Sequence, residues 1–266
     1  MEIKIFIFFL KIFLLIKSFK YEYINFIIVM NINMKLSFYC INFNDENRRS
    51  KMIERFRNQN INLEFVNPVY NNDERLNIES INNNDSLKRI WSIMLQHLDS
   101  IQHFISNTDD DYLILCEDDI LISKNIMRDL PSIIENFEEL KLDILLLGYL
   151  IHFKLDKNVN YDEFSIIKDT NLYTYYKFPY HLWGSQMYLI SRKHCFFLLN
   201  KYTINYALED LNRPYNPDWT LTKDGVKAMI YPMIALEEGV TKTDHEGQNN
   251  FHKLCFDVNY NENIYS

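Results

Sequence analysis

The sequence predicts an α/β fold with a mostly parallel central sheet, and three observations support this prediction. A strand, a helix and a second strand follow one another between residues 35 and 69, as in a βαβ unit. Two later segments, Tyr112–Cys116 and Asp143–Tyr149, contain apolar runs without polar alternation, which is typical of strands covered on both faces. Segments with helical periodicity lie between these strands, so helices are available to cover the sheet.

The first half of the chain supplies the βαβ unit and the clearest helix. Lys35–Phe43 is expected to form the first strand and Leu63–Val69 the second. Between them, Arg48–Gln59 has apolar residues at helical spacing, with Asp45 as its N-cap. Ser86–Ser106 repeats apolar residues every three or four positions, which predicts an amphipathic helix.

The second half continues the alternation with more irregular connections. Residues 151–178 are rich in polar residues and tyrosine, so we expect an irregular or short-stranded insertion there. The tail beyond Glu238 is polar and is expected to be partly loose. The remaining expected elements are a helix at Lys124–Leu140, a strand at His181–Ile190, a helix at Arg192–Tyr202, and a last strand at Ala228–Leu236 that Pro232 interrupts.

Composition excludes some classes of partner. The chain has 266 residues, with 36 acidic against 28 basic residues and a formal net charge of -8. It has no basic stripe, so we expect no nucleic-acid partner, and phosphate recognition would depend on a metal or on isolated arginines. The four cysteines are widely separated and form no C-x-x-C pair, so we expect neither a zinc site nor a disulfide framework. Free cysteines of this kind favour a reducing compartment such as the cytoplasm.

Two regions are expected, an apolar N-terminal extension over residues 1–33 and a domain over residues 34–266. The apolar run within residues 3–16 is too short to span a bilayer of roughly 30 Å as a helix. Three interpretations stay open: a signal-like or weakly membrane-associating segment, a dispensable extension upstream of a start near Met30 or Met34, and a peripheral helix. The first would allow the secretory-pathway lumen as the alternative location. The second is favoured because the first strand follows Met34 directly.

The most informative motif is the acidic run that ends the strand Tyr112–Cys116. Buried parallel strands carry their sites at their C-terminal ends, and adjacent carboxylates there repel one another unless a cation binds. Glu117 and Asp119 are two positions apart, so in an extended chain both point to one side while Asp118 points away. The pair therefore predicts a Mg²⁺ or Mn²⁺ site. The alternative is a solvated acidic turn that opens a helix.

Four motifs occur in order between about Met34 and Gly247. They are Tyr39–Phe43 with a following Arg48, the run Glu117–Asp119, the element Gly184–Arg192, and Pro217–Trp219. In this order they resemble glycosyltransferase family 25, the lipooligosaccharide and procollagen galactosyltransferase family. The resemblance implies a GT-A-like, nucleotide-sugar-binding α/β sandwich. It also implies metal-dependent, inverting transfer of a hexose, galactose or glucose, from a UDP-sugar to a glycan or a hydroxylated protein.

The resemblance and the residue chemistry together assign candidate roles. Asp119 is the first expected metal ligand, and Glu117 binds either the metal or the ribose of the nucleotide. Asp218 is the candidate base that takes the acceptor proton, with Asp244 as the alternative; an ordinary loop cap is the competing role for Asp218. The residues expected to contact the nucleotide sugar are Asn42, Arg48, Glu117, Asp118 and Gln186.

Several positions keep two interpretations. Trp183 could line the donor or acceptor site or pack in the core. A third metal ligand could come from His97, His245 or His252, although a lone histidine is usually not a ligand. Two competing functions also stay open: a catalytically degenerate family member that acts as a carbohydrate-binding or interaction module, and a metal-dependent phosphoesterase, which would need further Asp and His ligands.

Overall fold

The computed structural model describes residues 35–240 and 245–266, whose elements belong to one compact unit, Leu36–Ser266. The expected extension over residues 1–33 and the candidate base Asp244 lie outside the described residues. Within the described ranges, no helix has both the length and the apolar character needed to cross a membrane.

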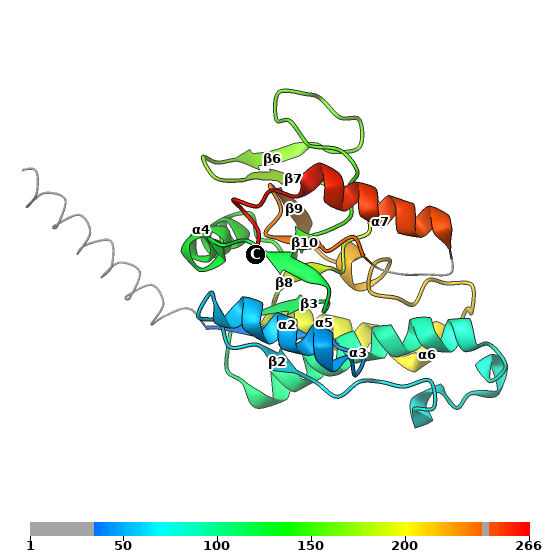
Figure 1. Ribbon diagram of the computed structural model, residues 1–266. Helices are drawn as coiled ribbons and strands as arrows, with labels where there is room; N and C mark the ends of the chain where they lie inside the picture. Colours follow the sequence, from blue (N-terminus) through cyan, green and yellow to red (C-terminus); the bar gives the residue numbers. More distant parts are fainter. Residues whose placement is uncertain (1–34, 241–244) are drawn as a thin grey trace, which may run out of the picture. The chain divides into compact units, whose positions relative to one another are not determined.

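An eight-stranded sheet forms the centre of the unit (Figure 1). β1 pairs in parallel with β2 and β3, and β5 pairs in parallel with β9. β8 is antiparallel to both β3 and β5, and β7 is antiparallel to both β9 and β6. Six of the eight strands therefore point in one direction. The order across the sheet is β2 (Glu64–Phe65), β1 (Leu36–Cys40), β3 (Tyr112–Cys116), β8 (Met187–Ser191), β5 (Ile144–Gly148), β9 (Lys227–Tyr231), β7 (Thr174–Tyr176) and β6 (Ile166–Asp169).

Helices connect the strands and cover the sheet. The α-helices are α2 (Glu46–Arg57), α3 (Asp85–Asn107), α4 (Ile126–Glu139), α5 (Arg192–Lys201), α6 (Ile204–Leu208) and α7 (Glu246–Asn259). Within residues 35–240 and 245–266 there are also three short 3₁₀ turns, η1 (Glu74–Leu76), η2 (Glu79–Ile81) and η3 (Leu221–Lys223). A second, two-stranded sheet pairs β4 (Ile120–Ile122) with β10 (Ala235–Glu237) in antiparallel fashion.

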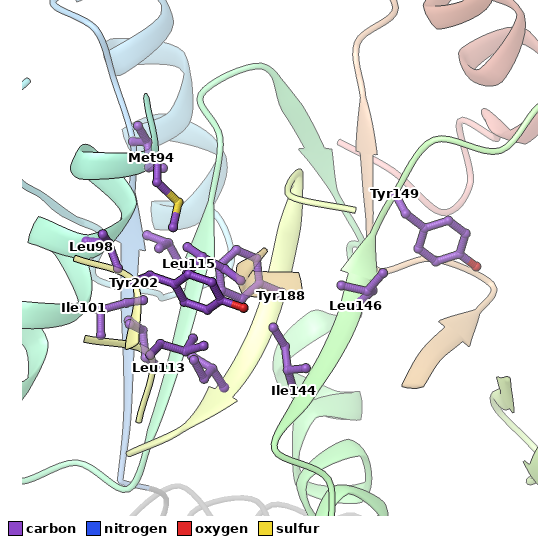
Figure 2. Close-up of a cluster of buried hydrophobic side chains, with 14 of the residues drawn as sticks. Met94, Leu98, Ile101, Leu113, Leu115, Ile144, Leu146, Tyr149, Tyr188 and Tyr202 are labelled. Carbon is purple, nitrogen blue, oxygen red and sulfur yellow. The ribbon is translucent and has the colours of Figure 1, made fainter. Parts of the chain in front are cut away.

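The larger hydrophobic core lies between the sheet and the helices α3 and α5. Figure 2 shows Leu98 and Ile101 of α3 beside Leu113 and Leu115 of β3. Tyr188 of β8 belongs to the same cluster and is fully buried. Because apolar residues recur along α3 at three- and four-residue steps, one face of this helix can bury against the sheet over its whole length.

The opposite face of the sheet contacts α2 and α4 through aromatic pairs. Phe38 of β1 packs edge-to-face on Phe56 of α2, with ring centroids 6.0 Å apart. Tyr112 of β3 packs in the same way on Phe137 of α4 at 5.9 Å. Since successive side chains of a strand point to opposite faces, both faces of β1 and β3 are buried, which explains their continuous apolar sequence. The predicted α/β fold with a mostly parallel central sheet is confirmed.

Four expected elements differ from the structure. The strand predicted at Leu63–Val69 covers only Glu64–Phe65, because β1, with which it pairs, ends at Cys40. The strand predicted at His181–Ile190 begins only at Met187, because the backbone amides before it bind a side chain, as described below. The strand predicted at Ala228–Leu236 is two strands in different sheets, since Pro232 cannot donate a ladder hydrogen bond.

The expectation of a loose tail is wrong for Glu246–Asn259, which forms α7. His252 and Cys255 of this helix are buried. A helix needs only one buried stripe to be stabilised by packing, so a largely polar sequence is compatible with it.

Candidate active site

The acidic run lies directly after β3 and is anchored on both sides by neighbouring strands. The backbone amide of Ile41, after β1, donates to Cys116 O at 2.8 Å, and the amide of Glu117 donates to Gln186 O at 3.0 Å. β1 and β3 pair in register as far as Cys40 and Cys116, so the chain leaves both strands at the same level. The ends of β1 and β3 and the start of β8 therefore meet at the acidic run, as expected for the carboxyl ends of parallel strands.

Asp118 connects the end of β3 to the end of β1 and to α2. Its Oδ2 accepts a hydrogen bond from Asn42 Nδ2 at 2.6 Å, and its Oδ1 accepts one from Arg48 Nη1 at 2.9 Å. Arg48 Nη1 also lies 3.4 Å from Asp119 Oδ2, so one guanidinium bridges two carboxylates. Asn42 is itself held, because Gln96 Nε2 donates to its backbone oxygen at 3.0 Å. Four of the predicted residues thus form one network.

Glu117 is linked to Asp218 through Ser185. Ser185 Oγ donates to Glu117 Oε1 at 2.6 Å. Asp218 Oδ1 accepts hydrogen bonds from the backbone amides of Gly184 at 2.8 Å and Ser185 at 2.9 Å. These amides are not available to a β-ladder, which is why β8 begins two residues later. The candidate base predicted from the sequence therefore lies beside the acidic run.

Glu237 and His252 complete the cluster from the C-terminal part of the chain. Glu237 ends β10, His252 lies on α7, and His252 Nδ1 is 2.5 Å from Glu237 Oε2. Burial lowers the pKa of His252, but the hydrogen bond to Glu237 and the charges of Glu237, Asp119 and Asp218 outweigh burial and raise this pKa above its ordinary value. The imidazole therefore contacts Glu237 and is also stabilised in its charged form by Asp119 and Asp218.

The electrostatics of Glu117 show how closely the carboxylates gather. Burial, followed by the charges of Asp119 and Asp218, raises the pKa of Glu117 well above its usual range; Glu237 adds to this shift and the Ser185 hydrogen bond opposes it. Glu117 is thus affected by three further acidic side chains, of which Asp119 also follows β3, Glu237 ends β10 and Asp218 lies in the loop before η3. Such an arrangement is costly without a compensating positive charge.

The donor set of this cluster fits a hard divalent cation. Mg²⁺ typically binds one or two protein carboxylates and fills its remaining positions with water and substrate phosphates, and carboxylates also suit Mn²⁺. Glu117 and Asp119 would supply the two carboxylates, and a cation would offset both the burial of Glu117 and the repulsion from Asp119 and Asp218 that raise its pKa. In the described part of the chain, no three His, Cys, Asp or Glu side chains converge as a complete metal site.

Two other sequence-predicted residues have distinct environments. Gln186 is buried, and its Oε1 has no hydrogen-bond partner within residues 35–240 and 245–266. Trp183 is partly buried, and its ring contacts those of Trp219 and His252, with centroids 6.3 Å and 6.2 Å apart. Trp183 thus lies at the edge of the acidic cluster.

The three candidate histidines have different environments. His97 is fully buried in α3, its Nδ1 lies 2.9 Å from the Tyr188 hydroxyl, and burial lowers its pKa to about 3. It is therefore a neutral core residue at physiological pH. His245 is exposed at the N-terminus of α7. His252 lies against Glu237.

Glu237 and Ser185 belong to the site, and reasoning from the sequence did not identify them. A signal for Glu237 was present, because an acidic pair, Glu237–Glu238, directly follows an apolar segment, as Glu117 follows β3. Ser185 had no comparable signal, since its role depends on the distant residues Glu117 and Asp218.

Fold and site together define an α/β protein with a carboxylate-rich candidate active site at the end of a central strand. No known family profile matches the chain, and no curated protein matches it. Solved structures that it resembles include A197 from STIV (TM-score 0.38, 14% identity, covering 80% of this chain and 96% of that one).

It also resembles a glycosyltransferase involved in the glycosylation of the major capsid of PBCV-1 (TM-score 0.39, 10% identity, 82% of this chain and 98% of that one). A third structure is described as mannose-1-phosphate geranyltransferase from Thermus thermophilus (TM-score 0.39, 7% identity, 74% of each chain). At these values the likeness assigns neither an activity nor a substrate to this chain.

Proposed function

We propose that this chain is a metal-dependent glycosyltransferase that moves a hexose from a UDP-sugar to a glycan or hydroxylated protein acceptor, with inversion. The observation that carries the proposal is that Glu117, Asp119, Asp218 and Glu237, from three separate segments, lie near the carboxyl end of β3. Ser185 links Glu117 to Asp218, and the amide of Glu238, next to Glu237, donates to Asp119 O at 2.8 Å. The motif resemblance to family 25 supports the sugar-nucleotide donor and galactose or glucose as the hexose.

On the donor side, the residues after β1 and β3 would hold the nucleotide. Arg48 has 36% of its side chain exposed while it binds Asp118, so it retains donors that can reach a diphosphate. Asn42 and Gln96 fix the backbone at the end of β1, which keeps Asp118 in place. A Mg²⁺ or Mn²⁺ ion held by Glu117 and Asp119 would supply positive charge for the leaving diphosphate.

On the acceptor side, Asp218 would act as the base. Its Oδ1 is fixed by the amides of Gly184 and Ser185, while Oδ2 makes no hydrogen bond to any described residue. In the proposed reaction the acceptor hydroxyl transfers its proton to Asp218 Oδ2. The acceptor oxygen forms a bond to the anomeric carbon, and UDP leaves with the electrons of the broken C–O bond.

The direct test is release of UDP from UDP-galactose and UDP-glucose with Mn²⁺ present or chelated. We expect metal-dependent release by the wild type and loss of release in Asp119→Ala. Asp109→Ala is the matched control, because Asp109 is an exposed carboxylate that precedes β3 instead of following it. Release that is independent of metal, or equal in the wild type and Asp119→Ala, would refute the proposal. Cleavage of simple phosphate esters instead would indicate a phosphoesterase.

One observation favours a second candidate, a carbohydrate-binding module without turnover. Asp218 Oδ1 is engaged by two backbone amides, as in a purely structural loop cap. A binding module predicts affinity for a sugar or a UDP-sugar with no UDP release from any variant. Calorimetric titration beside the release assay distinguishes the two.

A further inference from the structure

A row of four aromatic rings leads from the surface to the acidic cluster. Tyr180 contacts Trp219 at a centroid separation of 5.6 Å, Trp219 contacts Trp183 at 6.3 Å, and Trp183 contacts His252 at 6.2 Å. Tyr180 is 61% exposed, the two tryptophans are partly buried, and His252 is buried beside Glu237. The row therefore connects solvent with the carboxylates of the candidate active site.

The rings are fixed by polar contacts between two segments of the chain. The Tyr180 hydroxyl donates to Trp219 O at 3.3 Å. Lys223 donates to Leu182 O, and its ammonium lies 5.5 Å from the Trp219 ring centroid. The loop that carries Trp219 is also closed on itself, because the Trp219 amide donates to Asn216 Oδ1 at 2.9 Å. Aromatic rings held in this way lose little conformational entropy when a ligand binds.

The setting of Lys223 shows that this support is built into the fold. Its side chain is buried between the Phe178 and Trp219 rings, with the Phe178 centroid 4.9 Å from its ammonium. Burial lowers the pKa of Lys223 to about 8, although the charge of Asp218 opposes this shift. Burying an amine lowers stability unless the amine is paired. The hydrogen bond to Leu182 O and the two aromatic rings offset that cost for Lys223.

The chemistry around the row matches a carbohydrate. Aromatic faces cover apolar C–H surfaces, and carboxylates accept hydrogen bonds from hydroxyl groups. Asp218 precedes Trp219 in sequence and His252 ends the row, so both kinds of group are adjacent here. The negative charge of the cluster disfavours an anionic lipid headgroup as the occupant.

We propose that Tyr180, Trp219 and Trp183 form the subsite for an acceptor pyranose and present one of its hydroxyls to Asp218. This inference rests on the proposed function and specifies its acceptor as a glycan. In a hydroxylated peptide, the other acceptor class, the hydroxylysine side chain that carries the hydroxyl is an open alkyl chain and lacks the C–H faces of a pyranose ring.

The experiment measures binding and transfer separately in the full chain. Methyl galactoside, methyl glucoside and a hydroxylysine-containing peptide are titrated while intrinsic tryptophan fluorescence is recorded, and the KM for each acceptor is measured by UDP release. In Tyr180→Ala we expect the glycoside Kd and KM to rise about fivefold, as the loss of one stacking contact implies. Tyr180 is exposed, so this variant is expected to fold, and its melting temperature checks that.

Tyr260→Ala is the matched control. Tyr260 is also an exposed tyrosine, at 43%, that stacks on another aromatic ring, Phe256, at 4.8 Å, outside the row. We expect its glycoside Kd and KM to equal those of the wild type. Equal effects of the two substitutions, or binding of the peptide alone, would overturn the inference.

The two proposals fail in different ways. UDP release without any glycoside binding would refute the proposed subsite but would be consistent with the proposed transferase activity. The opposite result is glycoside binding that Tyr180→Ala weakens, with no UDP release from the wild type. It would refute the transferase activity and support the subsite as a carbohydrate-binding surface.

Discussion

Glu237 and His252 lie against each other, with His252 Nδ1 2.5 Å from Glu237 Oε2, and both side chains are buried. Glu237 ends β10, whereas His252 lies in the middle of α7. This contact holds α7 against the end of the second sheet and adds a carboxylate and an imidazole to the acidic run after β3.

His252→Ala tests the structural weight of this contact. Removing one partner of a buried ion pair is expected to lower the free energy of unfolding by about 3 kcal/mol. The measurement is urea denaturation at pH 6, where the raised pKa of His252 keeps it charged. His181→Ala is the control, because His181 pairs with Glu163 at the surface, where ion pairs contribute little. Similar effects of both substitutions would show that the buried pair has no special role.

Asp218→Asn separates catalysis from architecture. Asparagine keeps an Oδ1 that accepts from the amides of Gly184 and Ser185, but it cannot take a proton as a carboxylate does. We therefore expect near-normal stability and UDP-sugar binding, with transfer lost. Asp218→Ala leaves both amides without their acceptor and should also cost about 2 kcal/mol in stability. Turnover of Asp218→Asn near the wild-type rate would show that Asp218 is not the base.

His97 predicts a specific acid sensitivity. Burial lowers its pKa to about 3, so between pH 6.5 and 3 the unfolded chain binds a proton that the folded chain does not. Stability should therefore fall with decreasing pH below 6.5, and this group contributes a slope of at most about 1.4 kcal/mol per pH unit.

In His97→Gln the slope should be shallower by that amount. The other titrating groups are shared by both proteins, so they cancel in the difference. The check is urea denaturation of both proteins at pH 7, 6 and 5, and parallel stability curves would contradict the assignment.

Gly225→Ala should destabilise the fold without touching the candidate site. Gly225 has φ of +73°, and an added Cβ would lie 2.7 Å from His194 Cε1 and 2.8 Å from Asp143 Cβ. We expect a loss of about 2 kcal/mol from strain and crowding together. Gly247→Ala is the control, since its Cβ would meet nothing within 4 Å and alanine favours a helix. Thermal unfolding of both variants distinguishes them, and equal melting temperatures would refute this account.

The interior of the sheet was predictable because its signal is local. The apolar runs of β3 and β5 are covered on both faces, so they lack the polar alternation of a half-exposed strand. The helix α3 was predictable for the same reason, since its buried residues recur at helical spacing. The position of Glu117 and Asp119 at the end of a central strand followed from the prediction of β3, which they directly follow in the sequence.

The C-terminal part was not predictable in the same way. The sequence of α7 is largely polar, and the burial of His252 and Cys255 depends on β10 being present to pack against. The start of β8 was misplaced because Asp218 takes the amides of Gly184 and Ser185. Contacts between residues so far apart in sequence leave no periodic pattern.

The sequence by itself determined the α/β class, the central strands and the acidic run after β3, because burial on both faces and charge at a strand end are properties of neighbouring residues. Only the tertiary structure decided that Asp218, Glu237 and His252 join that run and that Tyr180 begins a row of rings leading to it. The physical reason is that hydrophobic burial depends on the spacing of apolar residues along the sequence, which is visible locally. Hydrogen bonds and charge interactions between distant residues form only when the fold brings their groups together.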